Sequence, residues 1–183
     1  MDLIMNADDL GISRRVNRAT FDLMEQQIVT SSTLLANGEF IEEACGELFR
    51  FPNCSFGVHL NITEFRPLSG SGLIRPLLDD ENMFQQSRTR GVIFDRQLLE
   101  GIFEEFSAQI QKLLSMGVPL SHIDSHHYIL SMPRLFLVLK RIQKQFGIRK
   151  TRITRNIYAY ESVSRLGLTP HQLGLNPEFV DED

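Results

Sequence analysis

The chain has 183 residues, enough for one domain with a substantial core, and its formal net charge is −4. It contains no block of basic residues, which argues against a nucleic-acid partner, and no apolar stretch approaches the roughly 18 residues of a membrane span. The N-terminus lacks a signal-peptide pattern, and two cysteines indicate no disulfide framework. We therefore expect a soluble, cytoplasmic protein without a nucleic-acid or membrane partner.

Strand and helix patterns alternate along the chain. The expected elements are strand 3–5, helix 14–27 with Ser13 as its N-cap, strand 28–35, helix 39–51, strand 55–62, helix 95–116, strand 122–127, helix 133–146 and strand 149–154. Repeated strand–helix units predict an α/β fold with a parallel sheet or a barrel. Residues 64–93 hold glycines, prolines and mixed charges without a sustained period, so we expect an irregular lid or insertion loop there.

Three polar segments follow or end predicted strands. Asp8 and Asp9 come after the first apolar run, His59 lies in Gly57-Val58-His59-Leu60, and residues 122–127 read His-Ile-Asp-Ser-His-His. Sites in α/β folds are built at the carboxyl ends of the strands, so these segments are expected to meet. Taken singly, an acidic pair is more often a turn or helix cap, and a lone histidine is more often a hydrogen-bonded core residue. Together they predict a metal site.

One carboxylate and two imidazoles would form a mixed oxygen and nitrogen shell with open positions. Such a shell suits Zn²⁺ or another divalent first-row ion, and suits Mg²⁺ less naturally. The second carboxylate of the acidic pair is then free to act as a general base toward water, provided that it does not bind the metal itself. One aspartate as a metal ligand and the other as a general base would explain why the two residues are adjacent.

The chain resembles the YdjC-like carbohydrate deacetylases, the family of the chito-oligosaccharide deacetylases. The resemblance runs from the first residues to about Asn156. The segments that carry it are residues 6–13 (NADDLGIS), residues 29–33 (VTSST) with Ala36-Asn37-Gly38, residues 57–60 (GVHL) and residues 122–127 (HIDSHH). It implies a TIM-barrel-like α/β fold and the metal-dependent hydrolysis of an N-acetyl group on an oligosaccharide.

The resemblance also implies roles for individual residues. Asp9, His59 and His126 match the ligands of one divalent ion, Mg²⁺ or Zn²⁺, and Asp8 matches the general base. Two further residues, Asp124 and His127, correspond to groups beside the ligands or the substrate. Arg152 either contacts substrate or supports the base, or it is a solvated charge at the edge of a strand, and the sequence leaves these alternatives open.

Two departures from the family pattern bear on activity. The family commonly continues His-His-His-Val-His, whereas this chain has His126-His127-Tyr128-Ile129-Leu130. Family members also run on for tens of residues, so residues 1–183 are expected to form a single domain that lacks the last strands of the barrel. A homodimer would be one way to cover the open edges. The alternatives to a deacetylase are a metal-binding but silent member, or a metal hydrolase acting on another amide or a phosphoester.

Overall fold

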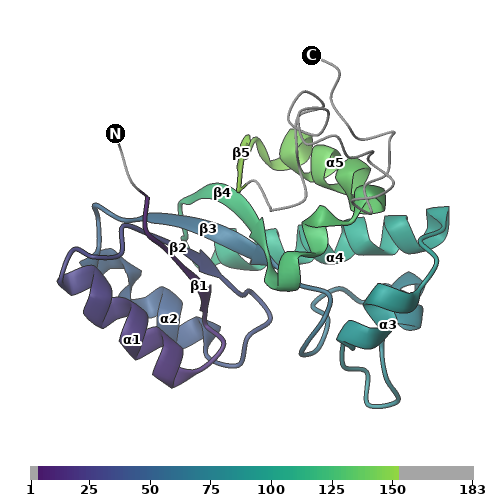
Figure 1. Cartoon of the computed structure of the whole chain (residues 1–183), viewed down its shortest axis with the longest axis horizontal. Helices are drawn as coiled ribbons and strands as arrows, with labels where there is room; N and C mark the ends of the chain where they lie inside the picture. The colour runs from purple at the N-terminus through teal and green to yellow at the C-terminus, as the bar shows by residue number, and fades with distance from the viewer. Residues whose placement is uncertain (1–3, 153–183) are drawn as a thin grey trace, which may run out of the picture.

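The computed structural model describes residues 4–152, which form one sheet with helices packed around it (Figure 1). The strands are β1 (Asn6–Leu10), β2 (Ser31–Leu34), β3 (Ser55–Leu60), β4 (Leu120–Ser125) and β5 (Lys150–Thr151). The α-helices are α1 (Arg14–Glu25), α2 (Ile41–Glu47), α3 (Gln86–Gly91), α4 (Arg96–Ser115) and α5 (Phe136–Phe146). Short 3-10 helices are η1 (Leu48–Arg50), η2 (Gly72–Leu77), η3 (His126–Ser131) and η4 (Pro133–Leu135).

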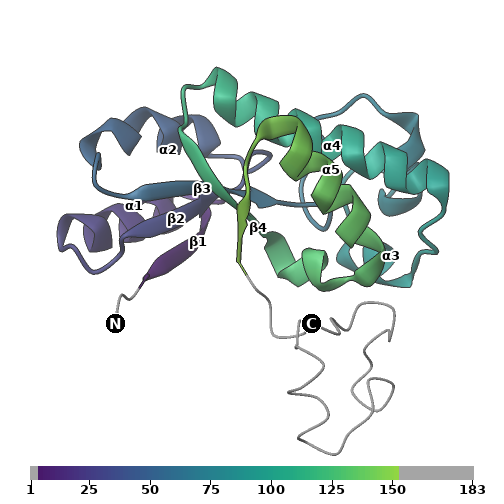
Figure 2. The same ribbon diagram turned by 90° about the horizontal axis from the view of Figure 1, so that it is seen from above.

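The five strands are all parallel and lie in the order β1-β2-β3-β4-β5. This order confirms the α/β class. Strands that follow one another in chain order are typical of a (β/α) barrel, whereas the order of a doubly wound sheet reverses at its centre. In both views α1 and α2 lie at one end of the sheet, and α3, α4 and α5 lie at the other (Figures 1 and 2).

The predicted first strand is wrong in position. The apolar run at residues 3–5 predicts a strand that ends at the two acids, but β1 is Asn6–Leu10 and contains Asp8 and Asp9 within it. Pairing with β2 skips one residue between Ala7 and Leu10, which marks a β-bulge. Asp9 lies in the left-handed region with a φ of 64°. The polar strand is tolerated because the bulge directs its carboxylates into a cluster of partners.

Most of the other elements agree with the sequence patterns, with shifts at their ends. Ser13 caps α1 by accepting a hydrogen bond from the Val16 amide at 3.2 Å, as expected. Asp95 caps α4 in the same way through the Leu98 amide at 2.8 Å. The predicted strand 149–154 is described only as far as Arg152, and its remainder lies outside the described residues. No helix in residues 4–152 is long and apolar enough to cross a membrane.

Residues 64–93 are more regular than expected, because this segment contains η2 and α3, while the expected role as a lid or insertion stays a prediction. Ile74 and Leu77 are fully buried, and η2 packs against α4. The approach is close at Gly101, where an added Cβ would lie 2.7 Å from Leu73 Cβ. A six-residue helix is too short to show a helical period of apolar residues, so the sequence pattern does not predict η2 or α3.

Candidate metal centre

Asp9, His59 and His126 lie together at the carboxyl ends of β1, β3 and β4. Asp9 Oδ1 is 3.1 Å from His59 Nε2 and 2.7 Å from His126 Nδ1. The two imidazole rings meet edge to face, with centroids 5.4 Å apart. His59 and His126 are only 2% and 5% exposed, so their polar atoms depend on protein partners or an ion. The structure thus brings together all three residues expected to bind the metal.

The bulge in β1 explains how Asp9 reaches the two histidines. Positive φ is uncommon for a residue other than glycine, although aspartate tolerates it better than most, and it costs about 1–3 kcal/mol. Backbone strain of this kind persists where the surroundings fix it, often at functional sites. Here the bulge is held by the pairing of β1 with β2 and by the hydrogen bond from Ser32 Oγ to the Ala7 carbonyl at 2.8 Å.

His59 has further partners on the side of its ring away from Asp9. His59 Nδ1 lies 3.1 Å from Thr33 Oγ1 and 3.7 Å from Asp124 Oδ2. Burial alone would lower the pKa of His59, but contacts with Asp124 and Asp9 outweigh it and raise the pKa to about 9. Burial would likewise raise the pKa of Asp9, and the hydrogen bonds from His126 and His59 hold it well below its usual range.

The residues present fit a divalent ion. One carboxylate and two imidazoles offer donor atoms that all lie within 4.8 Å of one another. Asp124 Oδ2 is buried 3.7 Å from Nδ1 of His59, on the side of the ring away from Asp9. A carboxylate beside the second nitrogen of a histidine is an arrangement common around bound metals.

Asp8 lies beside this group in a separate ion-pair cluster. Its two carboxylate oxygens accept hydrogen bonds from Arg152 Nη1 and Nη2 at 2.7 and 2.8 Å, and Asn6 Nδ2 donates to Oδ1 at 2.7 Å. Burial would raise the pKa of Asp8, but the hydrogen bond and charge of Arg152 hold it below its usual value. Arg152 Nη2 is also 3.1 Å from Asp124 Oδ2. Arg152 is therefore paired with the candidate base and is not a free surface charge.

His127 lies at the exposed side of the centre. Its Nδ1 is 3.0 Å from Thr63 Oγ1, and its ring stacks at a tilt against His126 with centroids 4.0 Å apart. Burial and the neighbouring His126 lower the pKa of His127. Both His127 and Tyr128 have positive φ, 51° and 56°, so the chain turns sharply directly after His126.

The sequence reasoning missed Glu64. Its Oε2 lies 3.3 Å from His126 Nε2, and its Oε1 lies 4.0 Å from His127 Nε2. Glu64, His126 and His127 form a second group whose donor atoms all lie within 4.8 Å of one another. Glu64 was assigned to an irregular insertion, although it follows a strand that carries a candidate ligand. Its place just beyond the carboxyl end of that strand was the available signal.

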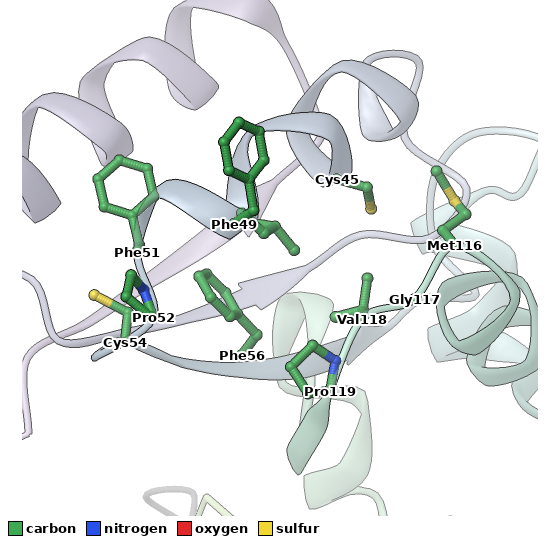
Figure 3. A pocket seen from close by; sticks show the side chains of 11 residues that line it. Cys45, Phe49, Phe51, Pro52, Cys54, Phe56, Met116, Gly117, Val118 and Pro119 are labelled. Atoms are coloured by element: carbon green, nitrogen blue, oxygen red, sulfur yellow. The ribbon is translucent and has the colours of Figure 1, made fainter.

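A hollow of about 330 Å³ lies at the opposite edge of the sheet (Figure 3). Its lining is Cys45, Leu48, Phe49, Phe51, Pro52, Cys54, Phe56, Met116, Gly117, Val118 and Pro119. These residues lie before or at the amino ends of β3 and β4, or on α2 and the turn after it. The lining is mainly apolar and lacks charged groups, so the chemistry of the molecule is concentrated at the carboxyl edge.

Comparisons with known proteins show which family the chain resembles. A family model described as YdjC-like protein matches residues 2–181. Carbohydrate deacetylases of Clostridium beijerinckii and Vibrio campbellii are 36% and 33% identical over 148 residues, which is 81% of this chain but 58% and 57% of theirs. The chain thus spans less than two thirds of these relatives' length. A crystal structure from Enterococcus faecalis V583, of a provisionally assigned cellobiose-phosphate cleavage protein, matches with a TM-score of 0.73 and 25% identity, covering 94% of this chain and 64% of that one.

Proposed function

Because the chain belongs to the YdjC-like family, we propose that it is a metal-dependent hydrolase that removes N-acetyl groups from amino-sugar oligosaccharides of the chito-oligosaccharide type. One observation carries the proposal. Asp9, His59 and His126 meet at the carboxyl edge of the sheet, directly beside an ionised Asp8. A carboxylate–bis-imidazole group with a neighbouring carboxylate that is not one of the ligands is suited to metal-assisted hydrolysis.

The proposed ligands are Asp9, His59 and His126, and the ion is Mg²⁺ or Zn²⁺. The nitrogen-rich donor set favours Zn²⁺. When bound, a divalent ion would lower the pKa of a water molecule and polarise the acetamide carbonyl.

Asp8 is the proposed general base. Its carboxylate accepts a proton as water attacks the carbonyl carbon and returns it to the nitrogen as the C–N bond breaks. The acetic acid formed then gives its proton to the released amine, so that acetate and the protonated amine leave. Arg152 donates a hydrogen bond to each oxygen of Asp8, which fixes the orientation of the carboxylate and keeps it ionised at neutral pH. Asp124 Oδ2 forms an ion pair with Nη2 of the same arginine and also lies beside His59. In this scheme Asp124 and Arg152 position the groups that react, and His127 faces the substrate.

The test is acetate release from diacetylchitobiose by the full chain, with the metal content of the same sample measured by elemental analysis. Asp8→Asn is expected to lower kcat by about 100-fold or more while leaving the metal content unchanged. Asp80→Asn, at an almost fully exposed aspartate, is the matched control and should retain full activity. Full activity of Asp8→Asn would overturn the base assignment.

A wild-type protein that binds one ion per chain but releases no acetate would be a silent member of the family. Small ester, amide and phosphoester substrates, assayed in parallel, separate that outcome from hydrolysis of a different bond. His126→Ala is expected to lose the ion, and an unchanged metal content would refute the ligand assignment.

A further inference from the structure

Glu64 is a carboxylate at the metal centre to which the proposed function gives no role. We propose that Glu64 is a positioning residue: it accepts a hydrogen bond from Nε2 of His126 and so presents Nδ1 of that ring to the ion. The proposal rests on the metal centre proposed above and concerns how that centre is built. It also gives the segment after β3 a part in metal binding.

The geometry of His126 supports this role. The ring is 5% exposed, and each nitrogen faces one carboxylate: Nδ1 is 2.7 Å from Asp9 Oδ1, and Nε2 is 3.3 Å from Glu64 Oε2. A neutral histidine that binds a metal through one nitrogen carries its proton on the other, and a hydrogen-bond acceptor there fixes both the tautomer and the ring orientation. Glu64 is placed to be that acceptor, as Thr33 and Asp124 are for His59.

A buried polar network holds the backbone of Glu64 in place, while its side chain is 43% exposed. Asn61 is fully buried; its Oδ1 accepts hydrogen bonds from the amides of Thr63 and Glu64 at 2.9 and 3.3 Å, and its Nδ2 donates to the Glu64 carbonyl at 2.8 Å. Asn37 Nδ2 donates to the carbonyls of Glu64 and Arg66. The backbone that carries the carboxylate is therefore fixed from β3 and from the loop after β2.

The same network extends to α4. Gln109 bonds both the amide and the carbonyl of Asn61, at 3.0 and 2.6 Å, and also donates to Glu105 Oε1. Glu105 is fully buried and accepts from the amides of Leu68 and Ser69. A loop tied to a helix by this many buried bonds has little freedom, which is what a residue that orients a ligand needs.

An alternative role for Glu64 is that of a direct ligand in a second ion site with His126 and His127. That site would need Nε2 of His126, the nitrogen that carries the proton when Nδ1 binds the ion beside Asp9. His127 Nε2 also lies farther from Glu64, at 4.0 Å, and is partly exposed. The observations therefore favour one ion per chain with Glu64 outside its shell.

The test is the affinity of the full chain for Zn²⁺, measured by competition with a chromophoric chelator. Glu64→Ala is expected to weaken binding by about 10–100-fold. Glu64→Gln should bind within about threefold of wild type, because its amide oxygen still accepts from Nε2. Glu64→Lys, which cannot accept, should weaken binding as Glu64→Ala does. Glu81→Ala, at an exposed glutamate of the same segment, is the matched control.

A second readout separates orientation from general stability. The visible absorption of bound Co²⁺ should change in Glu64→Ala and return in Glu64→Gln, while circular dichroism of the metal-free proteins stays the same. If Glu64→Ala and Glu64→Lys both bind Zn²⁺ with wild-type affinity, this inference is overturned and the proposed function is not. A fall from two bound ions to one in Glu64→Ala overturns it in favour of a direct ligand. Wild-type protein that binds no ion and releases no acetate overturns both this inference and the proposed function.

Discussion

Asn61→Ala should destabilise the protein by about 3 kcal/mol, because Asn61 satisfies several buried polar groups at once. Its loss leaves the amides of Thr63 and Glu64 and the Oδ1 of Asn37 without their bonds of 2.9, 3.3 and 3.0 Å. Two other partners keep a second bond: Asn37 still donates to the Glu64 carbonyl, and Thr63 Oγ1 remains beside His127. Each buried orphan costs about 1–3 kcal/mol, and water entering the vacated space recovers part of that cost.

The assay is urea unfolding of the metal-free protein followed by circular dichroism, with the free energy of unfolding obtained by linear extrapolation. Asn53→Ala, at an exposed asparagine, is the control and should change the free energy by less than about 0.5 kcal/mol. Asn61→Ala should also weaken Zn²⁺ binding, because the loop that carries Glu64 loosens. A loss of stability below about 1 kcal/mol together with unchanged Zn²⁺ affinity would refute the reasoning.

Three further changes test other parts of the structure. Arg152→Ala should lower kcat for acetate release by about 100-fold at unchanged Zn²⁺ affinity, because the candidate base loses its orientation; equal kinetics would contradict the ion-pair role. Burial raises the pKa of the Cys45 thiol to about 11. At pH 8, iodoacetamide should therefore alkylate Cys45 about 100-fold more slowly in the folded protein than in the urea-unfolded protein, as followed by mass spectrometry. Equal rates in the two states would contradict the burial argument. Gly38→Ala places a Cβ 2.5 Å from the Gly11 carbonyl oxygen and should lower the free energy of unfolding in urea by about 1–3 kcal/mol. Gly46→Ala, with open space around it, is the control and should stabilise α2. An unchanged stability of Gly38→Ala would show that the backbone moves to accommodate the added Cβ.

The fold class was predictable because apolar periodicity is repeated over long elements. Residues 95–116 show a helical pattern over more than five turns, and the structure has α4 there with Asp95 as its cap. The first strand was misplaced because β1 is short and polar, and its stability comes from tertiary partners, which no local pattern reveals. The short helices between residues 64 and 93 also depend on tertiary partners, because η2 packs against α4 and α3 packs against η2.

The candidate site was predictable where residue type and strand position coincide. Asp9, His59 and His126 each stand at or just beyond the carboxyl end of a predicted strand, so topology alone brought them together. The double contact between Arg152 and Asp8 could not be read from the sequence, because these residues are 144 positions apart and nothing local selects one partner. Glu64 was missed because its role depends on a buried network that joins β3 to α4.

The wide spacing of the three candidate ligands along the chain has a consequence for assembly. Asp9 and His126 are 117 positions apart, and they meet only when β1, β3 and β4 lie in one sheet. No short piece of the polypeptide contains the donor set, so the proposed ion site would form only with the assembled sheet. An ion bound there would link β1, β3 and β4, and its retention would report that these strands are in register.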